Sequence, residues 1–581
     1  MTDKTLSAQK AGTRTITGAQ IFMEALRKEG VKKIFGYPGG VILSIYEELY
    51  HCNDIKHFLV RHEQAAIHAA EGYARVTGKP GVALVTSGPG ACNTVTGIAN
   101  AYYDGYPIVV FTGQVDSKLI GNDAFQEADI VGITSPCCKH NFLVKNVKDL
   151  PRIIKEAFHI ASTGKPGPVV VDMPKNVLDG KAEFRYPEKV NLPGYNPTYD
   201  GHPLQIRKAL KYLYKAKAPV IITGGGIIAS NASDELTKLA RTLRVPVVNT
   251  LMGTGTFPGD DNLSLGMMGM HGNYCANMAV AHCDVLLALG TRFSDRVTGK
   301  LEKFCPDAKI IHVDIDPCSI SKNVPVDIPI VGDLKNILVD MLNEIDLTEA
   351  ENSFEKREIW LNQLNKWKEI KPKWNIKSGQ LLPQIVIQKI FESIKGKDAV
   401  VTTEVGQHQM WAANLCKFNE PRRFVTSGGL GTMGFGFPAA MGAQIAFPER
   451  LVLDISGDGS FQMNIQELAT CVNYKVPVKI CIINNGYLGM IRQLQDVLFN
   501  KNYSQCCLSG PDFVKLAEAY GAAGLRVTKE EEIIPAMKKA FEIDGPVIID
   551  FIVQHEELVY PWVLSGEPLN KILLNNPTGG V

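Results

Sequence analysis

The sequence has no run of about 18 apolar residues, the length that a transmembrane helix needs. Its 61 basic and 60 acidic side chains give a formal net charge of only +1, so we expect no basic surface for nucleic acid or for an anionic membrane. Residues 1–18 lack the apolar core of a secretory signal. We therefore expect a cytoplasmic protein that binds neither nucleic acid nor a membrane.

The 13 cysteines show no regular spacing and no C-x-x-C pair. Two doublets, at 137–138 and 506–507, suit neither a disulfide framework nor a zinc site. Free thiols in a reducing compartment are the simpler interpretation.

A chain of 581 residues is too long for one hydrophobic core, and short apolar runs alternate in it with helical patterns. This alternation predicts an α/β protein whose parallel sheets are wrapped by helices. Small residues at helical spacing over 65–74 indicate one helix that packs closely on a sheet. The runs interpreted as buried strands lie at 31–36, 57–60, 81–87, 107–111, 218–223, 284–290, 309–316, 328–333, 398–406, 450–459, 478–485 and 546–553.

Charged, proline-containing segments near 181–203 and 346–380 are interpreted as linkers. They divide the chain into three similar-sized, doubly wound parallel-sheet domains followed by a tail. The predicted bounds are 15–180, 204–345 and 381–555, with the tail at 556–581.

Two polar motifs follow neighbouring strands of the third predicted domain. Gly457-Asp458-Gly459 ends one strand, and Asn484-Asn485 ends the next one after an intervening helix. A right-handed crossover brings both strand ends to the same sheet edge, so Asp458 and Asn485 should meet there. A carboxylate, an amide oxygen, a backbone carbonyl and phosphate oxygens form the octahedral site that Mg²⁺ prefers. The paired motifs thus favour a magnesium diphosphate site over two connecting turns.

Glycine-rich segments support this interpretation. The two glycines of the GDG motif let the backbone approach phosphates, and Ser460 offers donors at the following helix start. GQHQMW (406–411) and SGGLGTMGFGFP (427–438) are each weak signals alone, because glycine-rich turns are common. Both are predicted to point at the same crevice.

With these motifs the chain resembles the thiamine-diphosphate enzymes, and among them the large catalytic subunits of acetolactate (acetohydroxyacid) synthase. The resemblance runs from about residue 15 to the end. It rests on GYPGG (36–40), RHEQAA (61–66), TSGPG (86–90), DAFQE (123–127), GMHG (269–272), RFSDRVTG (292–299), GQHQMWAA (406–413) and GGLGTMGFG (428–436).

The resemblance implies a pyrimidine-binding first domain, an FAD-binding central domain and a diphosphate-binding third domain. Thiamine diphosphate would lie between the first domain of one subunit and the third of another, so a homodimer is the minimum. A homotetramer and a regulatory small subunit stay open. The implied reaction decarboxylates pyruvate and transfers the two-carbon unit to a second 2-keto acid, pyruvate or 2-ketobutyrate. Branched-chain amino acid biosynthesis is the implied role, with fermentation as the open alternative.

The resemblance also implies residue roles. Glu63 matches the glutamate that trades a proton with the aminopyrimidine ring, and burial should raise its pKa. Met433 matches the residue that holds the cofactor bent, and the Gly431 carbonyl would accept from its amino group. The expected metal ligands are Asp458, Asn485 and the Tyr487 carbonyl. Further cofactor contacts are expected from Gln407, His408, Gly459, Ser460 and Met490.

The family's substrate entrance and flavin site map onto the first two domains. Arg296 would face the carboxylate of the acceptor, and an acid such as Asp314 at a strand end suits a ribose hydroxyl. FAD is implied to be structural, without a redox role in the net reaction. The entrance residues are Gly40, Phe125, Gln126 and Lys175. The FAD contacts are Gly224, Gly225, Gly226, Thr250, Met270, His271, Arg292, Asp314 and Asp333.

Five positions depart from the family pattern. Leu494 stands where a tryptophan favours 2-ketobutyrate over pyruvate, so we expect a bias towards acetolactate and weak inhibition by sulfonylureas. The other departures, which bear on the acceptor pocket and the FAD site, are Val41, Asp116, Lys165 and Ser294.

Two classes of alternative remain. Pyruvate oxidase, simple 2-keto acid decarboxylases and FAD-free catabolic acetolactate synthases share the superfamily, but RFSDRVTG and GMIRQ (489–493) argue against them. A non-catalytic protein could keep the same fold. The presence of Glu63, Asp458 and Asn485 together argues against that alternative.

Overall fold

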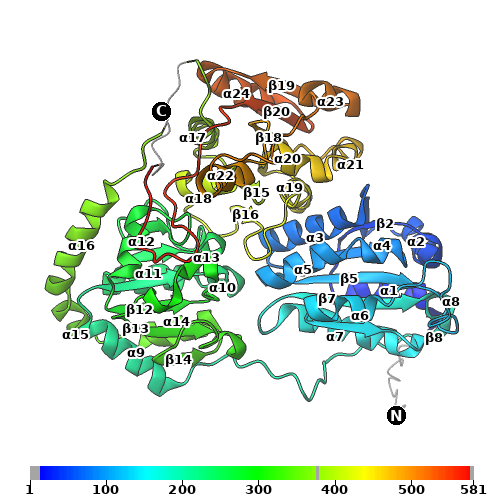
Figure 1. Cartoon of the computed structure of the whole chain (residues 1–581). Coiled ribbons are helices and arrows are strands. Elements are labelled where there is room, and N and C mark those ends of the chain that lie inside the picture. The colour runs from blue at the N-terminus through cyan, green and yellow to red at the C-terminus, as the bar shows by residue number, and fades with distance from the viewer. Residues whose placement is uncertain (1–13, 375–378, 576–581) are drawn as a thin grey trace, which may run out of the picture.

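Three six-stranded sheets, one in each third of the chain, organise the molecule (Figure 1). The computed structural model describes residues 14–374 and 379–575. Within these residues every strand pair of the three large sheets is parallel. The predicted α/β architecture of three parallel-sheet units is confirmed.

The first sheet has the strand order β3-β2-β4-β5-β7-β6. Its inner strands β5 and β7 are buried along their whole length, as expected of parallel strands covered on both faces. The strands are β2 (Lys33–Tyr37), β3 (Lys56–Leu59), β4 (Gly81–Val85), β5 (Ile108–Gln114), β6 (His140–Leu143) and β7 (Pro168–Pro174). The helices are α1 (Gly18–Lys28), α2 (Leu43–Tyr50), α3 (Glu63–Thr77), α4 (Pro89–Cys92), α5 (Val95–Asp104), α6 (Ile130–Thr134), α7 (Leu150–Ser162) and α8 (Lys175–Asp179). A separate antiparallel pair is formed by β1 (Thr15–Thr17) and β8 (Lys181–Glu183).

The second sheet has the order β11-β10-β9-β12-β13-β14. Its strands are β9 (Pro219–Thr223), β10 (Val247–Asn249), β11 (Ser264–Met267), β12 (Val285–Leu289), β13 (Lys309–Asp314) and β14 (Ile328–Val331). Its helices are α9 (Pro203–Lys215), α10 (Gly225–Ala229), α11 (Ser233–Leu243), α12 (Tyr274–Ala281), α13 (Asp295–Thr298) and α14 (Leu334–Asn343).

The third sheet has the order β16-β15-β17-β18-β20-β19. Its strands are β15 (Ala399–Thr403), β16 (Phe424–Thr426), β17 (Leu451–Gly457), β18 (Lys479–Asn484), β19 (Ala523–Val527) and β20 (Val547–Ile552). Its helices are α17 (Pro383–Ser393), α18 (Gln407–Leu415), α19 (Gly436–Ala446), α20 (Asp458–Phe461), α21 (Glu467–Tyr474), α22 (Gly489–Leu498), α23 (Phe513–Tyr520) and α24 (Ile533–Glu542).

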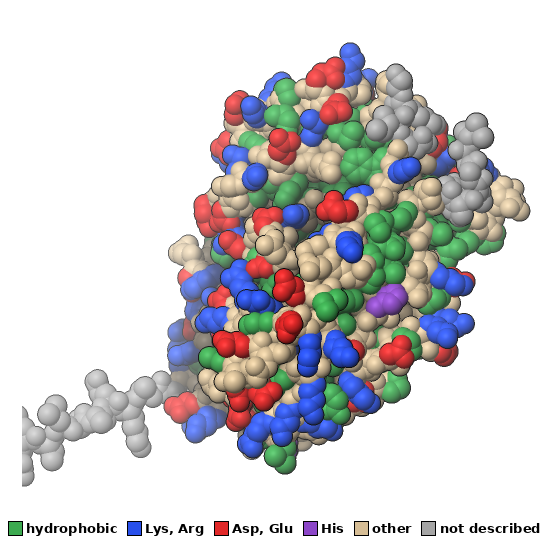
Figure 2. All heavy atoms as spheres, turned by 90° about the vertical axis from the view of Figure 1, so that its left-hand side faces the viewer, with side chains coloured by type: hydrophobic (Ala, Val, Ile, Leu, Met, Phe, Trp, Pro, Cys, Tyr) green, Lys and Arg blue, Asp and Glu red, His purple; other side chains and the backbone are tan. Residues whose placement is uncertain are grey.

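The segment at 346–380, interpreted above as a linker, is largely helical. It contains α15 (Leu347–Asn352) and α16 (Phe354–Lys368), and Arg357, Trp360 and Leu364 of α16 are buried. These side chains share one helix face because they are three and four positions apart. The face of the molecule that carries α16, at the left of Figure 1, mixes acidic and basic side chains (Figure 2). The charge that suggested a linker therefore belongs to the exposed side of a packed helix.

The first and third units meet where α3 packs against α19 (Figure 1). Alanines of both helices share one hydrophobic core with strands of the two sheets. No helix among the described residues combines the length and the hydropathy needed to cross a membrane.

Candidate active site

The carboxyl ends of β17 and β18 form the edge at which the GDG and NN motifs meet. The strands pair with Gly457 opposite Ile483. Asp458 begins α20, and its Oδ2 accepts a 3.1 Å hydrogen bond from the backbone N–H of Gly486, the residue after Asn485. The predicted convergence of Asp458 and Asn485 is therefore confirmed.

Neighbouring amides orient Asn485. Its Oδ1 accepts from the backbone N–H of Tyr487 at 3.0 Å, and its Nδ2 donates to Gln407 Oε1 at 3.4 Å. Gln407, the first residue of α18, in turn donates its Nε2 to Gln493 Oε1 and to the Glu557 carbonyl, both at 3.0 Å. Because the side-chain nitrogens of Asn485 and Gln407 both act as donors, the side-chain amide of Asn485 is held in one orientation, with its Oδ1 directed at the turn that follows.

Asp458 and His408 have the chemistry of an ionic, phosphate-bearing site. Asp458 is buried, and burial raises the pKa of its carboxyl to about 6. A divalent cation would replace the lost solvation and keep this carboxylate ionised. His408 is also buried; a Cβ added to Gly457 would lie 3.1 Å from its Nδ1, so the imidazole abuts the GDG turn. These residues fit a magnesium diphosphate.

The loop between β16 and α19 adds two predicted residues to this edge. Gly431 and Gly434 have φ values of 75° and 78°, which favour glycine. Between them Met433 approaches the GDG turn, since a Cβ added to Gly459 would lie 3.8 Å from Met433 Cε. The structure thus gathers Gln407, His408, Met433, Asp458, Gly459, Ser460, Asn485 and Tyr487 around one edge of the third sheet.

Glu63 and Gln126 of the first unit lie on either side of the 86–90 loop. Glu63 begins α3, and its Oε2 accepts from Asn93 Nδ2 at 3.0 Å. Cβ atoms added to Gly88 and Gly90 would lie 2.7 Å from the Gln126 carbonyl oxygen and 3.3 Å from Glu63 Oε1, respectively. These two predicted residues therefore belong to one cluster.

The other predicted entrance residues are open to solvent. Phe125 is 88% exposed, and Lys175 pairs with Asp179 on its own helix. A Cβ at Gly40 would meet no described heavy atom within 4 Å. A large cavity lies next to the third sheet. Among the described residues, its lining includes none of the five residues predicted in the first unit, which are Gly40, Glu63, Phe125, Gln126 and Lys175.

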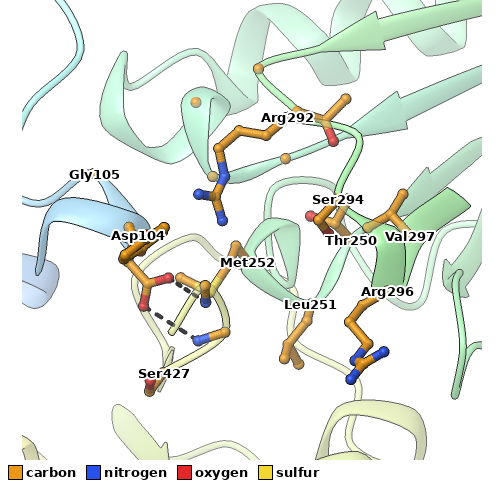
Figure 3. A pocket seen from close by; sticks show the side chains of 18 of the residues that line it. Asp104, Gly105, Thr250, Leu251, Met252, Arg292, Ser294, Arg296, Val297 and Ser427 are labelled. Atoms are coloured by element: carbon orange, nitrogen blue, oxygen red, sulfur yellow. Dashed lines mark hydrogen bonds between the residues drawn. The ribbon is translucent and has the colours of Figure 1, made fainter. Parts of the chain in front are cut away.

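That cavity has a volume of about 720 Å³ and is lined by residues of all three units (Figure 3). Gly225 faces it openly, whereas a Cβ on Gly224 would overlap the carbonyl of Gly290, so Gly224 is needed for close packing. The predicted flavin contacts among its lining residues are Gly224, Gly225, Gly226, Thr250, Met270, His271, Arg292, Asp314 and Asp333, with Arg296 beside them. Gly431, Met490 and Leu494 also line this cavity.

Two acids of this cavity have different environments. Burial raises the pKa of Asp314 to about 6, and its Oδ1 accepts from the backbone N–H of Asp316 at 2.9 Å. Asp333 caps α14 by accepting from the backbone N–H groups of Lys335 and Asn336. Asp314 is thus the acid whose carboxylate would gain most from a ligand hydroxyl.

The C-terminal segment closes part of the cavity, which the sequence did not indicate. Trp562 lines it and stacks on His271 with ring centroids 5.9 Å apart. The backbone N–H of Val563 donates to the Met270 carbonyl at 2.7 Å. The tail therefore belongs to the site and is not merely an extension.

Comparison with known proteins places the chain in a family. It matches the thiamine pyrophosphate enzyme N-terminal TPP binding domain at residues 16–133, the central domain at 206–341 and the C-terminal TPP binding domain at 404–551. It is 48% identical over 569 residues to the acetolactate synthase large subunit of Haemophilus influenzae, covering 97% of this chain and 99% of that protein. The chain belongs to the acetolactate synthase family of thiamine pyrophosphate enzymes.

Two further members of the acetolactate synthase family are similarly close. The large subunit from Buchnera aphidicola is 50% identical over 567 residues, covering 96% of this chain and 98% of that protein. The isozyme 3 large subunit from Escherichia coli is 47% identical over 567 residues, covering 96% of this chain and 99% of that protein. The similarity spans the whole three-unit architecture, including the edge that holds Asp458.

Several lining residues of this acetolactate synthase family member were not predicted. Asp104 and Gly105 follow no recognisable motif, and Trp562 lies in the predicted tail. The available signal for Asp104 is that it is the one charged residue of an otherwise uncharged helical segment, just before YYDGYP (102–107) ends in proline.

Proposed function

We propose that this chain is a thiamine-diphosphate- and magnesium-dependent acetolactate synthase. It decarboxylates one pyruvate and joins the remaining two-carbon unit to a second 2-keto acid, giving 2-acetolactate when the acceptor is pyruvate. The observation that carries the proposal is the meeting of Asp458 with the turn after Asn485, beside Met433, in a chain of this family.

The residues of the site divide the work of holding the cofactor. When bound, thiamine diphosphate supplies a carbon that stabilises the negative charge left by loss of carbon dioxide. The Gly431 carbonyl would accept from the cofactor's amino group, and Met433 would support its ring. Asp458, Asn485 and the Tyr487 carbonyl would hold magnesium. Gln407, His408, Gly459 and Ser460 would hold the diphosphate.

A second copy of the chain would complete the site. Glu63, proposed to hold a proton at the aminopyrimidine nitrogen, is on the first unit and outside the lining of the cavity that Met490 and Gly431 share. In a homodimer, Glu63 of one copy would serve the third unit of the other. Gly40, Phe125, Gln126 and Lys175 are proposed to form the substrate entrance with it, since exposed side chains such as Phe125 would then be covered.

Mixing two inactive variants tests this arrangement. Glu63→Gln and Asp458→Asn chains, unfolded and refolded together, would yield mixed dimers with one intact site. In a random mixture about half of the dimers are mixed, and each mixed dimer has one intact site of two. The mixture would therefore recover about a quarter of the wild-type activity, as expected for a two-fold symmetric pair. Recovery of no activity from correctly folded mixed dimers would contradict a shared site.

Product analysis tests the reaction. With pyruvate, magnesium and thiamine diphosphate, we expect 2-acetolactate and carbon dioxide, identified by mass. Acetaldehyde or acetyl phosphate as the main product would instead indicate a decarboxylase or an oxidase. Asp458→Asn should lower the affinity for magnesium and abolish most activity, whereas Asp340→Asn on the exposed face of α14 should change neither.

We also propose that FAD occupies the 720 Å³ cavity as a structural cofactor. The support is the grouping of all the predicted contacts there, including the buried Asp314. Bound flavin should be visible by its absorbance after purification, and Gly225→Val, which puts a side chain into the cavity, should reduce its retention. Normal flavin content in this variant would contradict the assignment.

A regulatory small subunit is a further proposed partner. The relatives from Haemophilus influenzae and Escherichia coli are named large subunits. Co-purification from the source cell, followed by mass spectrometry, would identify such a partner. A chain that purifies alone, is fully active and does not respond to branched-chain amino acids would contradict the proposal.

A further inference from the structure

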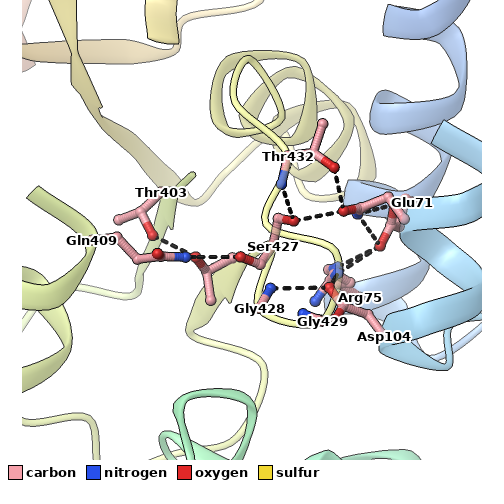
Figure 4. Close-up of polar contacts among 11 residues, drawn as sticks. Glu71, Arg75, Asp104, Thr403, Gln409, Ser427, Gly428, Gly429 and Thr432 are labelled. Carbon is pink, nitrogen blue, oxygen red and sulfur yellow. Dashed lines mark hydrogen bonds and ion pairs between the residues drawn. The ribbon is translucent and has the colours of Figure 1, made fainter. Parts of the chain in front are cut away.

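A buried arginine links two acids between the first unit and the loop that precedes α19. The Arg75 guanidinium donates to Glu71 Oε1 on the same helix and to Asp104 at the end of α5 (Figure 4). The side chains of Arg75, Glu71 and Asp104 are 2%, 0% and 0% exposed. One cation therefore faces two carboxylates in a place without solvent, and the charge must be balanced by other donors.

Backbone amides of the loop supply those donors. Asp104 Oδ1 accepts from the N–H of Gly429 at 2.6 Å, and its Oδ2 accepts from the N–H of Gly428 at 3.3 Å (Figures 3 and 4). The last turn of a helix is an unfavourable position for an acid, because the helix dipole is negative there. The placement of Asp104 is thus explained by the loop that it holds rather than by its own helix.

Asn100, one turn earlier on α5, holds the base of the same loop. Its Nδ2 donates to both oxygens of Glu71, which leaves Oδ1 as the acceptor for Ser427 Oγ at 2.6 Å and Thr432 Oγ1 at 2.9 Å. Ser427 Oγ also accepts from the backbone N–H of Thr432 at 2.8 Å. The two ends of the segment 427–432 are therefore joined to each other and to one side chain (Figure 4).

The loop held in this way carries the residues assigned to the thiamine ring. Gly431 lies inside the closed segment, and Met433 follows it directly. The same loop, at residues 427–431, also lines the proposed flavin cavity. A displacement of the loop would move both Gly431 and Met433, and misplacement by about 1 Å can cost about 100-fold in rate.

We propose that Asn100 and Asp104 are positioning residues for the reaction: they set the conformation of the 427–433 loop and thereby the place of the Gly431 carbonyl and of Met433. The proposal rests on the proposed function of the site. Asn100 does not line the proposed flavin cavity, and Asp104, which does, has its carboxylate oxygens bonded to Arg75 and to the two loop amides. Both act from the first unit of the same chain on the diphosphate-binding unit.

Three test variants and one control separate this role from simple adhesion between the units. Asp104→Ala removes the acceptor of both loop amides, and Ser427→Ala opens the base of the loop without changing any charge. Lys33→Met is the matched control, because Lys33 also links the two units, through the Ile445 carbonyl, but lies away from the loop. Asp104→Asn, which keeps one acceptor oxygen, should be intermediate between Asp104→Ala and the wild type.

The first measurement needs no cofactor. Hydrogen exchange of the 427–433 segment, in chains without added ligands, should be faster in Asp104→Ala and Ser427→Ala than in the wild type and unchanged in Lys33→Met. Unchanged exchange in both loop variants would overturn the proposal.

The second measurement separates kcat from binding. We expect kcat to fall about 10- to 100-fold in Asp104→Ala, with the apparent affinity for thiamine diphosphate within about fivefold, since Asp458 and Asn485 hold the other end. The near-ultraviolet circular dichroism of bound cofactor should change as well. A merely structural role predicts a lower midpoint of unfolding but normal kcat per folded, cofactor-loaded chain, and that result would overturn the proposal. A wild-type chain that makes no acetolactate would contradict the proposed function. The hydrogen-exchange measurement would still test whether Asp104 and Ser427 hold the loop, because it needs neither cofactor nor activity.

Discussion

Gly72 of α3 lies directly against the backbone of Ala439 of α19. A Cβ added to Gly72 would overlap the carbonyl oxygen of Ala439, and a Cβ on Gly442 would overlap that of Ala69 in the same way. The two helices thus approach each other backbone to backbone. Helix α3 begins at Glu63, and α19 follows the loop that contains Met433. The contact between the two helices therefore sets the distance between Glu63 and this loop within one chain.

Gly72→Ala should destabilise the contact between the first and third units. Alanine is favoured over glycine in a helix by about 1 kcal/mol, but overpacking a close contact costs about 1–3 kcal/mol, and backbone cannot turn aside as a side chain can. We therefore expect a lower midpoint of thermal unfolding and lower activity. Gly194→Ala is the control, because a Cβ there would meet no described atom within 4 Å. An unchanged midpoint for Gly72→Ala would contradict the argument.

The strands near the site could be predicted because parallel strands buried on both faces are continuous apolar runs. Each of the twelve predicted runs overlaps a strand, and these strands include β17 and β18, whose ends carry Asp458 and Asn485. β7 (168–174) is not among the predicted strands although it is wholly buried. The helix α16 was mistaken for a linker, since its charged outer face hid the spacing of Trp360 and Leu364.

The polar network around Arg75 could not be predicted from the sequence. Its partners come from α3, α5 and a loop more than three hundred positions away. Hydrophobic periodicity locates helices and strands, but it does not show which buried charges meet across two units. The sequence of one chain also does not show which third unit Glu63 and Phe125 approach, because a second copy of the chain is proposed to cover them.

Glu63→Gln should lower kcat without preventing cofactor binding. Glutamine keeps the shape of the side chain and can still bond to Asn93, but it cannot hold and return a proton. Loss of a general acid–base group typically costs about 10²–10⁴-fold, and we expect a fall of that order in steady-state assays. Glu47→Gln, at an exposed acid of the same unit, should have no effect. Activity within a few-fold of wild type would rule out the proton-holding role.

Leu494→Trp should shift the choice of acceptor towards 2-ketobutyrate. Leu494 lines the cavity near Met490 and Leu498, and a larger indole there would contact the extra methyl of that acceptor. One methylene is worth about 1–3 kcal/mol in discrimination. In a competition between pyruvate and 2-ketobutyrate, the wild type should favour acetolactate, and the variant should form more acetohydroxybutyrate. A wild type that already makes a strong excess of acetohydroxybutyrate would refute this expectation.

Asp172→Asn should flatten the pH dependence of stability. Asp172 is buried on β7 of the first sheet, and burial raises the pKa of its carboxyl from 3.8 to about 7, although Thr112 and Gln114 donate hydrogen bonds to it. Between about pH 4 and pH 7 the folded chain holds a proton that the unfolded chain has released. The free energy of unfolding therefore falls as the pH rises through this window.

The neutral amide of Asp172→Asn has no proton to lose, so the variant should gain stability relative to the wild type as the pH rises from about 4 to about 7. A difference of one in pKa corresponds to about 1.4 kcal/mol, which makes the effect measurable. Thermal unfolding midpoints of both chains across this range provide the test, with Asp340→Asn as an exposed control. Parallel pH profiles for wild type and Asp172→Asn would show that the carboxyl at position 172 is already ionised in the folded chain throughout the window.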